Sequence, residues 1–438
     1  MMLAPDRGAV PGRRAADPLT VAVDARLDNG LAGGVQQFVL GLASALCALD
    51  DGTEDYRFLG RRTEQGWLLP YLGPRGSLMA ATSPLQGVQG FRRQIGEHVP
   101  GARRLAGRLR KARLPNEVAL AASDGTLESS GIDVIHFTFQ DAFITNIPSI
   151  YQPWDLQHVH LPEFFTEAQR RWRDAAYRRF SDQADVVVVA SDWGRRDVIQ
   201  HLGVPASKVV VIGVPPPVRA YPDPDASTIE GTRARLELPD AFAFYPAQTW
   251  PHKNHVRLLE ALAAIRDRSG TEVPLVCSGV QNAHHAEILR AARRLGLERS
   301  VRFIGYVDPL DVQVLYRLAR LLVFPSLFEG WGLPIVEAFA TGLPVACSRV
   351  TSLPDLVGDA ALLFDPLEVD AIADAILSLW YDDDLRSVLA ARGHAVVARY
   401  DWRTTAQTYR ALYRSIAGRE LDDDDQGLLL QSTRTTAL

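Results

Sequence analysis

The sequence predicts an α/β protein with two doubly wound, Rossmann-like domains that face a common cleft. Three observations support this prediction. The chain has 438 residues, more than one ordinary core holds. Buried strand patterns alternate with helical apolar spacing, and this alternation occurs both before and after a proline-rich stretch. Open α/β sheets bind ligands beyond the carboxyl ends of their strands, so the cleft is the expected ligand site.

The first domain is predicted at residues 20–215, after a disordered lead-in at 1–19. It begins with the strand pattern TVAVDA, which a loop containing Gly33 and Gly34 joins to a helical pattern. Further strands are expected at 56–59, 134–137, 149–152, 185–190 and 209–213, and helices at 163–181 and 193–202. This alternation predicts a parallel sheet with crossover helices.

A linker is predicted at 216–239, because residues 215–239 contain six prolines and many polar residues. The second domain follows at 240–400. Its strands are expected at 242–245, 275–278, 301–304, 321–324, 345–347 and 361–364, and its helices at 255–269, 287–296, 309–320 and 369–399. Residues 419–438, which include the acidic run 422–425, are predicted to be a disordered acidic tail.

The composition is that of a globular protein, with 47% apolar and 23% charged residues. A net charge of −5 argues against a general nucleic-acid binder. The three cysteines, Cys47, Cys277 and Cys347, lie far apart and are expected to be buried free thiols in a reducing compartment. The sequence shows no apolar run of membrane-spanning length and no His, Asp or Glu cluster with metal-ligand spacing. We therefore expect neither a membrane span nor a metal.

The most informative stretch is FPSLFEGWGLPIVEAFATGLPV at residues 324–345. A strand pattern leads into a turn with Gly330 and Gly332, and a helix is expected from about Pro334, with Glu337 in its first turn. Strand, glycine turn and helix N-terminus form a geometry that binds phosphate through backbone N–H groups. Glu329 and Glu337 flank this turn and can accept hydrogen bonds from hydroxyl groups. The pattern indicates a pocket for a nucleotide sugar.

This stretch, extended through PSLFEGWGLPIVEAFATGLPVACSRVTSLPDLVGDAALLFDP, resembles the signature of the retaining GT-B glycosyltransferases that carry an E-x7-E element. A Glu-x7-Glu pair alone is common by chance, but the embedded pattern PS-x-x-EG-x-GLP-x-x-EA is specific. The similarity covers roughly residues 130–418. It implies a GT-B fold in which a helix at 401–418 crosses back to the first domain.

The resemblance implies a role for each matching residue. Glu337 would bind the donor ribose, and Glu329 would face the donor sugar. The backbone cradle of the diphosphate and the first-domain glycine loop would be formed by Gly330, Trp331, Gly332, Leu333, Gly33 and Gly34. Simpler interpretations stay open: a helix-dipole carboxylate, a solvated loop acid and ordinary glycine turns.

Lys253, in the motif YPAQTWPHKNH, matches the lysine of the family's K-N element and would stabilise the leaving diphosphate. The alternative is a surface lysine. Many members carry an arginine five residues earlier, where this chain has Gln248. Members without that arginine often act on GDP-mannose or deoxysugar nucleotides.

The family usually places a histidine of the first domain near the donor sugar. The candidates are His136, His158 and His160, and we favour His158 because DLQH resembles the family's D-L-x-H turn. Trp154 stands where a histidine is common. A core or loop histidine without a catalytic role is the alternative.

The resemblance implies a retaining glycosyltransferase that moves a hexose or deoxyhexose to a hydroxyl acceptor in polysaccharide or glycoconjugate synthesis, with no cofactor and no metal. A nucleotide-sugar 2-epimerase and a non-catalytic nucleotide-sugar-binding protein are the alternatives. The expected partners are a nucleotide-sugar donor and a glycan or lipid-linked acceptor. Residues 91–113 carry eight Arg or Lys and suit either a solvated basic face or peripheral contact with a membrane. We expect a cytoplasmic protein, with that contact at the inner membrane face.

Overall fold

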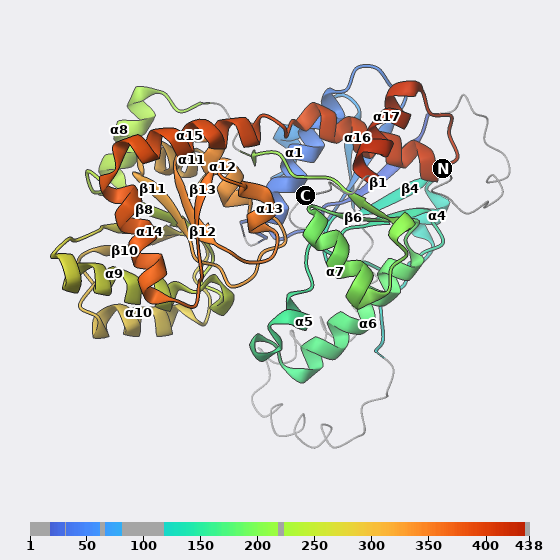
Figure 1. Cartoon of the computed structure of the whole chain (residues 1–438). Coiled ribbons are helices and arrows are strands. Elements are labelled where there is room, and N and C mark those ends of the chain that lie inside the picture. Colours follow the sequence, from blue (N-terminus) through green and yellow to red (C-terminus); the bar gives the residue numbers. More distant parts are fainter. Residues whose placement is uncertain (1–17, 31, 62–65, 81–117, 218–222, 434–438) are drawn as a thin grey trace, which may run out of the picture.

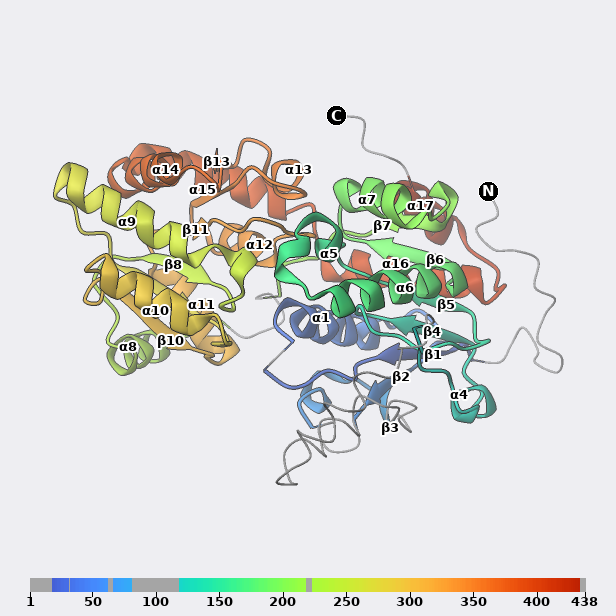
Figure 2. The same ribbon diagram turned by 90° about the horizontal axis from the view of Figure 1, so that it is seen from below.

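A computed structural model describes residues 18–30, 32–61, 66–80, 118–217 and 223–433. The described chain forms two parallel sheets, each packed with helices, that lie side by side (Figures 1 and 2). The predicted α/β class with two Rossmann-like units is confirmed. The basic segment 91–113 lies outside the described residues, as does most of the predicted lead-in.

The first sheet has seven parallel strands in the order β3-β2-β1-β4-β5-β6-β7. Val21 and Val23 belong to the core on one face and Ala22 to the core on the other, because neighbouring strand residues point to opposite faces. The strands are β1 Thr20–Asp24, β2 Asp55–Gly60, β3 Gly76–Ala80, β4 Val134–Phe137, β5 Ser149–Tyr151, β6 Val186–Val189 and β7 Val209–Val211. The helices are α1 Gly34–Ala48, α4 Thr126–Ser129, α5 Gln157–His160, α6 Glu167–Gln183 and α7 Asp192–Leu202.

The second sheet has six parallel strands in the order β10-β9-β8-β11-β12-β13. The strands are β8 Ala243–Pro246, β9 Leu275–Ser278, β10 Val301–Gly305, β11 Leu321–Phe324, β12 Val345–Ser348 and β13 Ala361–Phe364. The helices are α9 His255–Ser269, α10 His285–Arg294, α11 Pro309–Leu318, α12 Leu333–Thr341, α13 Leu353–Val357, α14 Val369–Tyr381 and α15 Asp383–Val397. The sequence predicts one helix at 369–399, but the structure has two, α14 and α15, separated at Asp382. The Asp382 side chain caps α15 by accepting a hydrogen bond from Leu385 N.

The strand order reverses between β1 and β4 in the first sheet and between β8 and β11 in the second. Such reversal points open a crevice at the carboxyl ends of the strands. The two crevices face each other, and α1 and α12 lie side by side at the boundary between the sheets (Figures 1 and 2). The fold therefore directs the loops after β1, β8 and β11 into one shared space.

Helix α16, Trp402–Ile416, runs from the second half back onto the first and packs on α1 (Figure 1). The rings of Trp402 and Phe38 lie 6.3 Å apart, and Tyr413 Oη lies 2.9 Å from His136 Nδ1 beneath the first sheet. These contacts tie the end of the chain to the first core. No described helix is long and apolar enough to span a membrane.

The prediction of a disordered tail is wrong for residues 423–433, which form α17, Asp423–Thr433. Arg414 Nη1 on α16 lies 2.9 Å from Asp425 Oδ2, and Leu429 is buried. The sequence pattern of the acidic run predicts a solvated segment. Acidic residues in the first turn of a helix interact favourably with the helix dipole, however, and one of them, Asp425, is buried in an ion pair with the partly buried Arg414.

The predicted linker also contains structure, because α8, Ala226–Arg235, lies inside 216–239. Asp225 caps this helix by accepting a hydrogen bond of 2.7 Å from Thr228 N. Thr232 Oγ1 then donates to Asp311 Oδ1 on α11 at 2.7 Å. Arg235 Nη2 donates to the same oxygen at 2.5 Å. The flanking prolines obscured a short helix that is held by its cap and by these hydrogen bonds to Asp311.

Candidate active site between the two sheets

A cavity of about 540 Å³ lies between the two halves. Its walls come from the loops after β1, β4, β5, β8, β9, β10 and β11, at the carboxyl ends of strands in both sheets. A concave site of this size holds a ligand such as a nucleotide. The pocket contains all the residues predicted to bind the donor: Gly33, Gly34, Lys253, Glu329, Gly330, Trp331, Gly332, Leu333 and Glu337.

Lys253 reaches the pocket from a short 3₁₀ turn, Pro251–Lys253, between β8 and α9. The next residue, Asn254, has a left-handed backbone with φ of 60°. Its side-chain Nδ2 donates to Pro325 O at 3.1 Å and to Pro366 O at 2.8 Å. These bonds anchor the turn from which the Lys253 side chain extends into the pocket.

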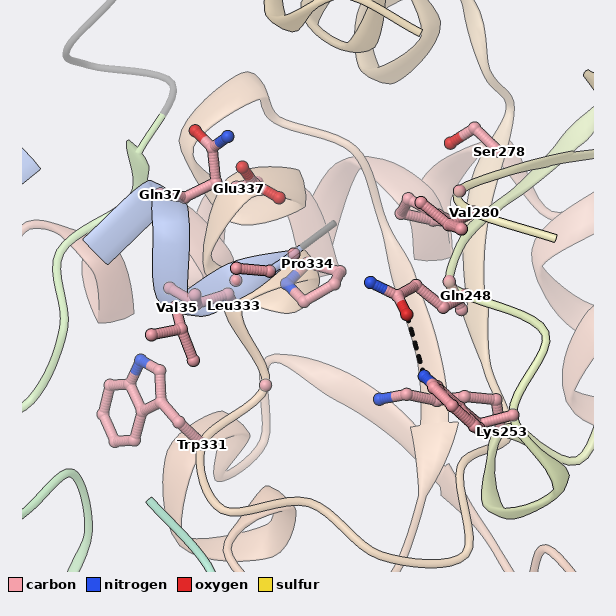
Figure 3. A pocket seen from close by; sticks show the side chains of 18 of the residues that line it. Val35, Gln37, Gln248, Lys253, Ser278, Val280, Trp331, Leu333, Pro334 and Glu337 are labelled. Atoms are coloured by element: carbon pink, nitrogen blue, oxygen red, sulfur yellow. Dashed lines mark hydrogen bonds between the residues drawn. The ribbon is translucent and has the colours of Figure 1, made fainter. Parts of the chain in front are cut away.

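Lys253 Nζ lies 2.5 Å from Glu329 Oε1 and 5.6 Å from the centre of the Phe324 ring. Lys253 is the one Lys or Arg among the described residues that line the pocket. Figure 3 shows it entering from the same side as Gln248, opposite Trp331 and Leu333. A single cation in a partly buried pocket is strongly attracted to any anion that enters.

The loop that carries Glu329 is held by side chains at the end of the β12–α13 loop. Glu329 N donates to Thr351 Oγ1 at 3.1 Å, and Thr351 Oγ1 donates back to Glu329 O at 2.7 Å. Ser352 Oγ also donates to Glu329 O, at 3.0 Å. Both backbone polar groups of Glu329 are therefore fixed by hydrogen bonds, and its carboxylate is held beside Lys253.

Helix α12 begins directly after this loop. Its N-cap is Gly332, with φ of 106°, a conformation that glycine adopts readily and other residues avoid. No side chain caps the helix, and Leu333 and Pro334 at its start line the pocket. An uncapped N-terminus that faces a cavity offers backbone N–H groups and the positive end of the helix dipole to an anion.

Glu337 is the fifth residue of α12, so the prediction that it lies in the first turn is wrong. The helix begins at Leu333 because Gly332 is its cap. Tyr316 Oη donates to Glu337 Oε2 at 2.8 Å. Burial raises the pKa of Glu337 to about 7, although the Tyr316 hydrogen bond acts in the opposite direction. The carboxyl points into the pocket, near Gln37 of α1 (Figure 3).

The first-domain wall of the pocket touches the second wall through glycines. A Cβ added at Gly34 would lie 2.8 Å from Leu333 Cδ1, and one added at Gly330 would lie 2.5 Å from Trp154 O. Gly33, with φ of 54°, faces Gln248 Nε2. Gly34 and Gly330 have no room for a side chain, so at these two positions the backbone of one wall lies directly against the other wall.

His158, the predicted catalytic histidine, does not line the pocket. Its ring is buried beside Tyr177, at a centroid distance of 5.1 Å, and burial lowers its pKa to about 4. His136 also lies in the core, bound to Tyr413, and His160 contacts Phe328 instead. The interpretation of His158 as a core histidine fits its position, because α5 turns the ring away from the cavity.

Sequence reasoning missed Asp155, which lines the pocket next to Trp154. Trp154 has φ of 67°, and its Nε1 donates to Thr138 O at 2.7 Å, which anchors the turn. Burial raises the pKa of Asp155. The signal in the sequence is the D-L-x-H motif. Its aspartate, Asp155, lines the pocket, whereas the prediction assigned the role to its histidine, His158.

Two large aromatic side chains at the pocket were also missed. Trp250 and Tyr306 line it and are about half exposed, at 48% and 51%. An added Cβ at Gly30 would lie 3.5 Å from the Tyr306 ring, so this ring reaches across to the first half. Exposed aromatic faces beside a polar cavity suit a planar group of a ligand.

The structure also brings together His160, Asp197 and His201, whose ligand atoms all lie within 4.8 Å of one another. The spacing of these residues in the sequence does not indicate the cluster, because His160 lies 37 positions before Asp197 in the chain. Asp197 and His201 are four residues apart on α7, which places them on one helix face, and His160 is the last residue of α5.

Residues 230–396 match the family described as glycosyl transferases group 1, and residues 79–215 match glycosyltransferase family 4. The chain is 33% identical over 258 residues to the O-antigen chain mannosyltransferase B of Escherichia coli. The aligned region covers 59% of this chain and 68% of that protein. It is 29% identical over 309 residues to the serotype-specific mannosyltransferase WbdA of Escherichia coli, of whose length it spans only 38%.

Two solved structures show the same GT-B fold. Sucrose-phosphate synthase of Thermosynechococcus elongatus matches 92% of this chain and 100% of its own, with a TM-score of 0.67 at 21% identity. Anabaena Alr3699/HepE, in complex with UDP and glucose, matches 91% of this chain and 100% of its own, with a TM-score of 0.65 at 20% identity. At these identities the likeness concerns the fold alone.

Proposed function

The chain belongs to the group 1 glycosyltransferases, and from this premise we propose that it transfers a hexosyl or deoxyhexosyl unit from a nucleotide sugar to an acceptor hydroxyl with retention of the anomeric configuration. GDP-mannose is the favoured donor. Two mannosyltransferases among the relatives and the neutral Gln248 at the usual arginine position support this choice. The product would be a glycan of a polysaccharide or glycoconjugate.

The observation that carries the proposal is the meeting of Lys253 and Glu329, at 2.5 Å, in front of the uncapped N-terminus of α12. A diphosphate placed there would contact the Lys253 ammonium on one side and backbone N–H groups on the other. Both stabilise the negative charge that grows on the leaving group, which is where preorganised charges accelerate a reaction. Glu329 keeps the ammonium in place until the donor binds.

The two carboxylates would divide the hydroxyl groups of the donor. Glu337 lies deeper in α12, and its position supports a contact with the ribose hydroxyls. Glu329 lies beside the Lys253 ammonium and would bind hydroxyl groups of the sugar. The half-exposed ring of Tyr306 or Trp250 offers a face for the base.

The acceptor would enter from the first-domain wall. When the walls meet, water leaves the pocket and the acceptor hydroxyl lies on the same face of the anomeric carbon as the leaving phosphate. The bond from the anomeric carbon to the phosphate oxygen breaks as the bond to the acceptor oxygen forms. The acceptor proton passes to the departing phosphate oxygen, so this step needs no protein nucleophile.

The test has two parts. Thermal unfolding with GDP-, UDP-, dTDP- and ADP-sugars identifies the donor class, because a ligand at about a hundred times its Kd adds roughly 2.7 kcal/mol of stability. The donor that stabilises the protein is then incubated with mannosylated acceptors, and NMR reports the anomeric configuration of the product. We expect a GDP-sugar to bind and an α-linked product to form from the α-linked donor.

Other outcomes would contradict specific parts of the proposal. An inverted product overturns retention, and a shift with UDP-sugars alone overturns the donor. Conversion of the donor sugar without any acceptor indicates an epimerase. Binding with no loss of donor across the acceptor set indicates a non-catalytic binding protein.

A further inference from the structure

His160, Asp197 and His201 form a compact group outside the donor pocket. His160 Nε2 lies 2.6 Å from Asp197 Oδ1, and His201 Nε2 lies 3.5 Å from the same oxygen. The two imidazole rings have centroids 5.1 Å apart at 80°. Asp197 is 5% exposed, whereas each histidine side chain is 29% exposed. Three ligand atoms from two separate elements thus converge at the edge of solvent.

We propose that these three side chains bind a divalent transition-metal ion of the zinc class. Two imidazole nitrogens and one carboxylate oxygen suit Zn²⁺, Co²⁺ and Ni²⁺, whereas Ca²⁺ and Mg²⁺ prefer oxygen ligands alone. At bond lengths of about 2.0 Å, a tetrahedral ion holds its ligand atoms about 3.3 Å apart. The His201 nitrogen stands at 3.5 Å from Asp197 Oδ1, close to this spacing, and the His160 nitrogen, now at 2.6 Å from the same oxygen, must move away from it. All three ligand atoms already lie within 4.8 Å of one another.

The backbone favours this arrangement without an ion. Asp197 and His201 are one helical turn apart on α7, so they share a face of the helix. His160 ends α5, and its ring lies 5.4 Å from Trp193 and 5.1 Å from Phe328. These aromatic rings shield one side of the site, while the exposed sides of the histidines leave room for a water ligand.

The site would join the two halves of the molecule. Phe328 belongs to the second half and directly precedes Glu329 of the pocket. Helix α7 makes two further contacts with that half: Arg196 Nη2 lies 3.3 Å from Asp355 Oδ2, and Ser191 Oγ, at its N-cap, donates to Gly330 O at 3.2 Å. A bound ion would hold the His160 ring against Phe328 and so restrain the loop that carries Glu329.

The first experiment titrates the metal-free full-length chain with Co²⁺ and with Zn²⁺ by calorimetry. We expect one equivalent to bind, and we expect His201→Ala to weaken binding at least tenfold, the smaller end of what even outer-shell changes at metal sites produce. Asp197→Asn should do the same, but Asp197 is buried, so a loss of folding in this variant would hide its effect on metal binding. The partly exposed His201 keeps the test valid.

The matched control is His284→Ala. His284 is also a partly exposed histidine, and its Nδ1 lies 3.2 Å from Glu287 Oε2. Among the described residues it does not belong to a group of three potential metal ligands, unlike His201. Metal binding should be unchanged in this variant. Equal binding in wild type and His201→Ala, or no binding in wild type, would overturn the proposal.

A second readout locates the ion. Co²⁺ quenches nearby tryptophan fluorescence, and Trp193 lies beside His160. We expect Co²⁺ to quench part of the wild-type emission and to quench less in Trp193→Phe, which should still bind one equivalent. The same quench in Trp193→Phe as in wild type would place the ion elsewhere and overturn the assignment. This test does not depend on which sugar the protein transfers.

Discussion

The two walls of the pocket differ in what they contribute. The second half supplies Lys253, Glu329, Glu337 and the start of α12, so nearly all the charge of the pocket lies on one side. The described lining of the first half is mainly glycine, amide and aromatic, and Asp155 is its one ionisable side chain. Under the proposed function, the charged wall would bind the diphosphate and ribose of the donor, and the less charged wall would bind the acceptor.

The walls also differ in what fixes them. Lys253 and Glu329 are held by hydrogen bonds within the second half. The first wall lies against the second at two glycines, where Gly34 faces the Leu333 side chain and Gly330 faces Trp154 O. We therefore expect changes in the second wall to affect the chemical step, and changes in the first wall to act through the fit between the halves.

The largest effect is expected from Lys253→Ala. Removing one group that stabilises developing charge typically lowers kcat by about 10²–10³-fold. Lys208→Ala is the control, because Lys208 lies outside the pocket and its Nζ donates to Asp182 O at 2.9 Å. Steady-state kinetics with the identified donor measure both variants. A near wild-type kcat in Lys253→Ala would contradict the proposal that the Lys253 charge stabilises the leaving diphosphate.

Gly330→Ala tests the contact between the walls. Its Cβ would lie 2.5 Å from Trp154 O, so the halves must move apart. A misplacement near 1 Å can cost about 10²-fold in rate, and overpacking costs about 1–3 kcal/mol of stability. Gly231→Ala is the control, because a Cβ there meets nothing within 4 Å. Unchanged kcat/KM in Gly330→Ala would show that the walls need not touch during catalysis.

Glu337→Gln tests the buried carboxyl through pH. The folded pKa is about 7 against a usual 4.5, so between these values the folded chain binds more protons than the unfolded chain. The free energy of unfolding of wild type therefore falls as pH rises through this window, and the variant lacks that term. Because Glu337 faces the pocket, we expect a relative change of only about 1 kcal/mol between pH 5 and pH 8.

Urea unfolding at both pH values measures this change. The variant should gain stability relative to wild type at the higher pH. Parallel pH profiles for the two proteins would show that Glu337 titrates normally.

The second wall was predictable because its chemistry is local in sequence. Glu329 and Gly332 lie within one short loop, and Lys253 follows a strand at a fixed spacing, so a linear motif carries their geometry. The position of Glu337 was wrong by less than a turn, because the φ of 106° at Gly332 decides where α12 starts. A sequence pattern indicates a helix more reliably than its first residue.

The first wall was harder to predict because its geometry depends on tertiary contacts. His158 and Asp155 lie three residues apart, and only the turn at Trp154, with φ of 67°, decides which of them faces the cavity. The metal cluster needs α5 and α7 to meet, and α17 needs Asp425 to reach Arg414. Local propensity carries none of this information, since packing against distant residues determines it.

The smallest effect is expected from Gln248→Ala. This variant tests whether Lys253 contributes more to diphosphate binding than the neutral Gln248 does. Gln248 Oε1 accepts a hydrogen bond of 2.8 Å from Trp250 Nε1, and its Nε2 faces Gly33 across the pocket. A neutral hydrogen bond contributes about 0.5–1.5 kcal/mol, so the Kd of the donor should rise by less than about tenfold. Calorimetric titration of GDP into Gln248→Ala and Lys253→Ala compares the two residues directly. An equal loss in both variants would mean that the neutral Gln248 contributes as much to diphosphate binding as Lys253 does, and would overturn the dominant role given to the Lys253 charge.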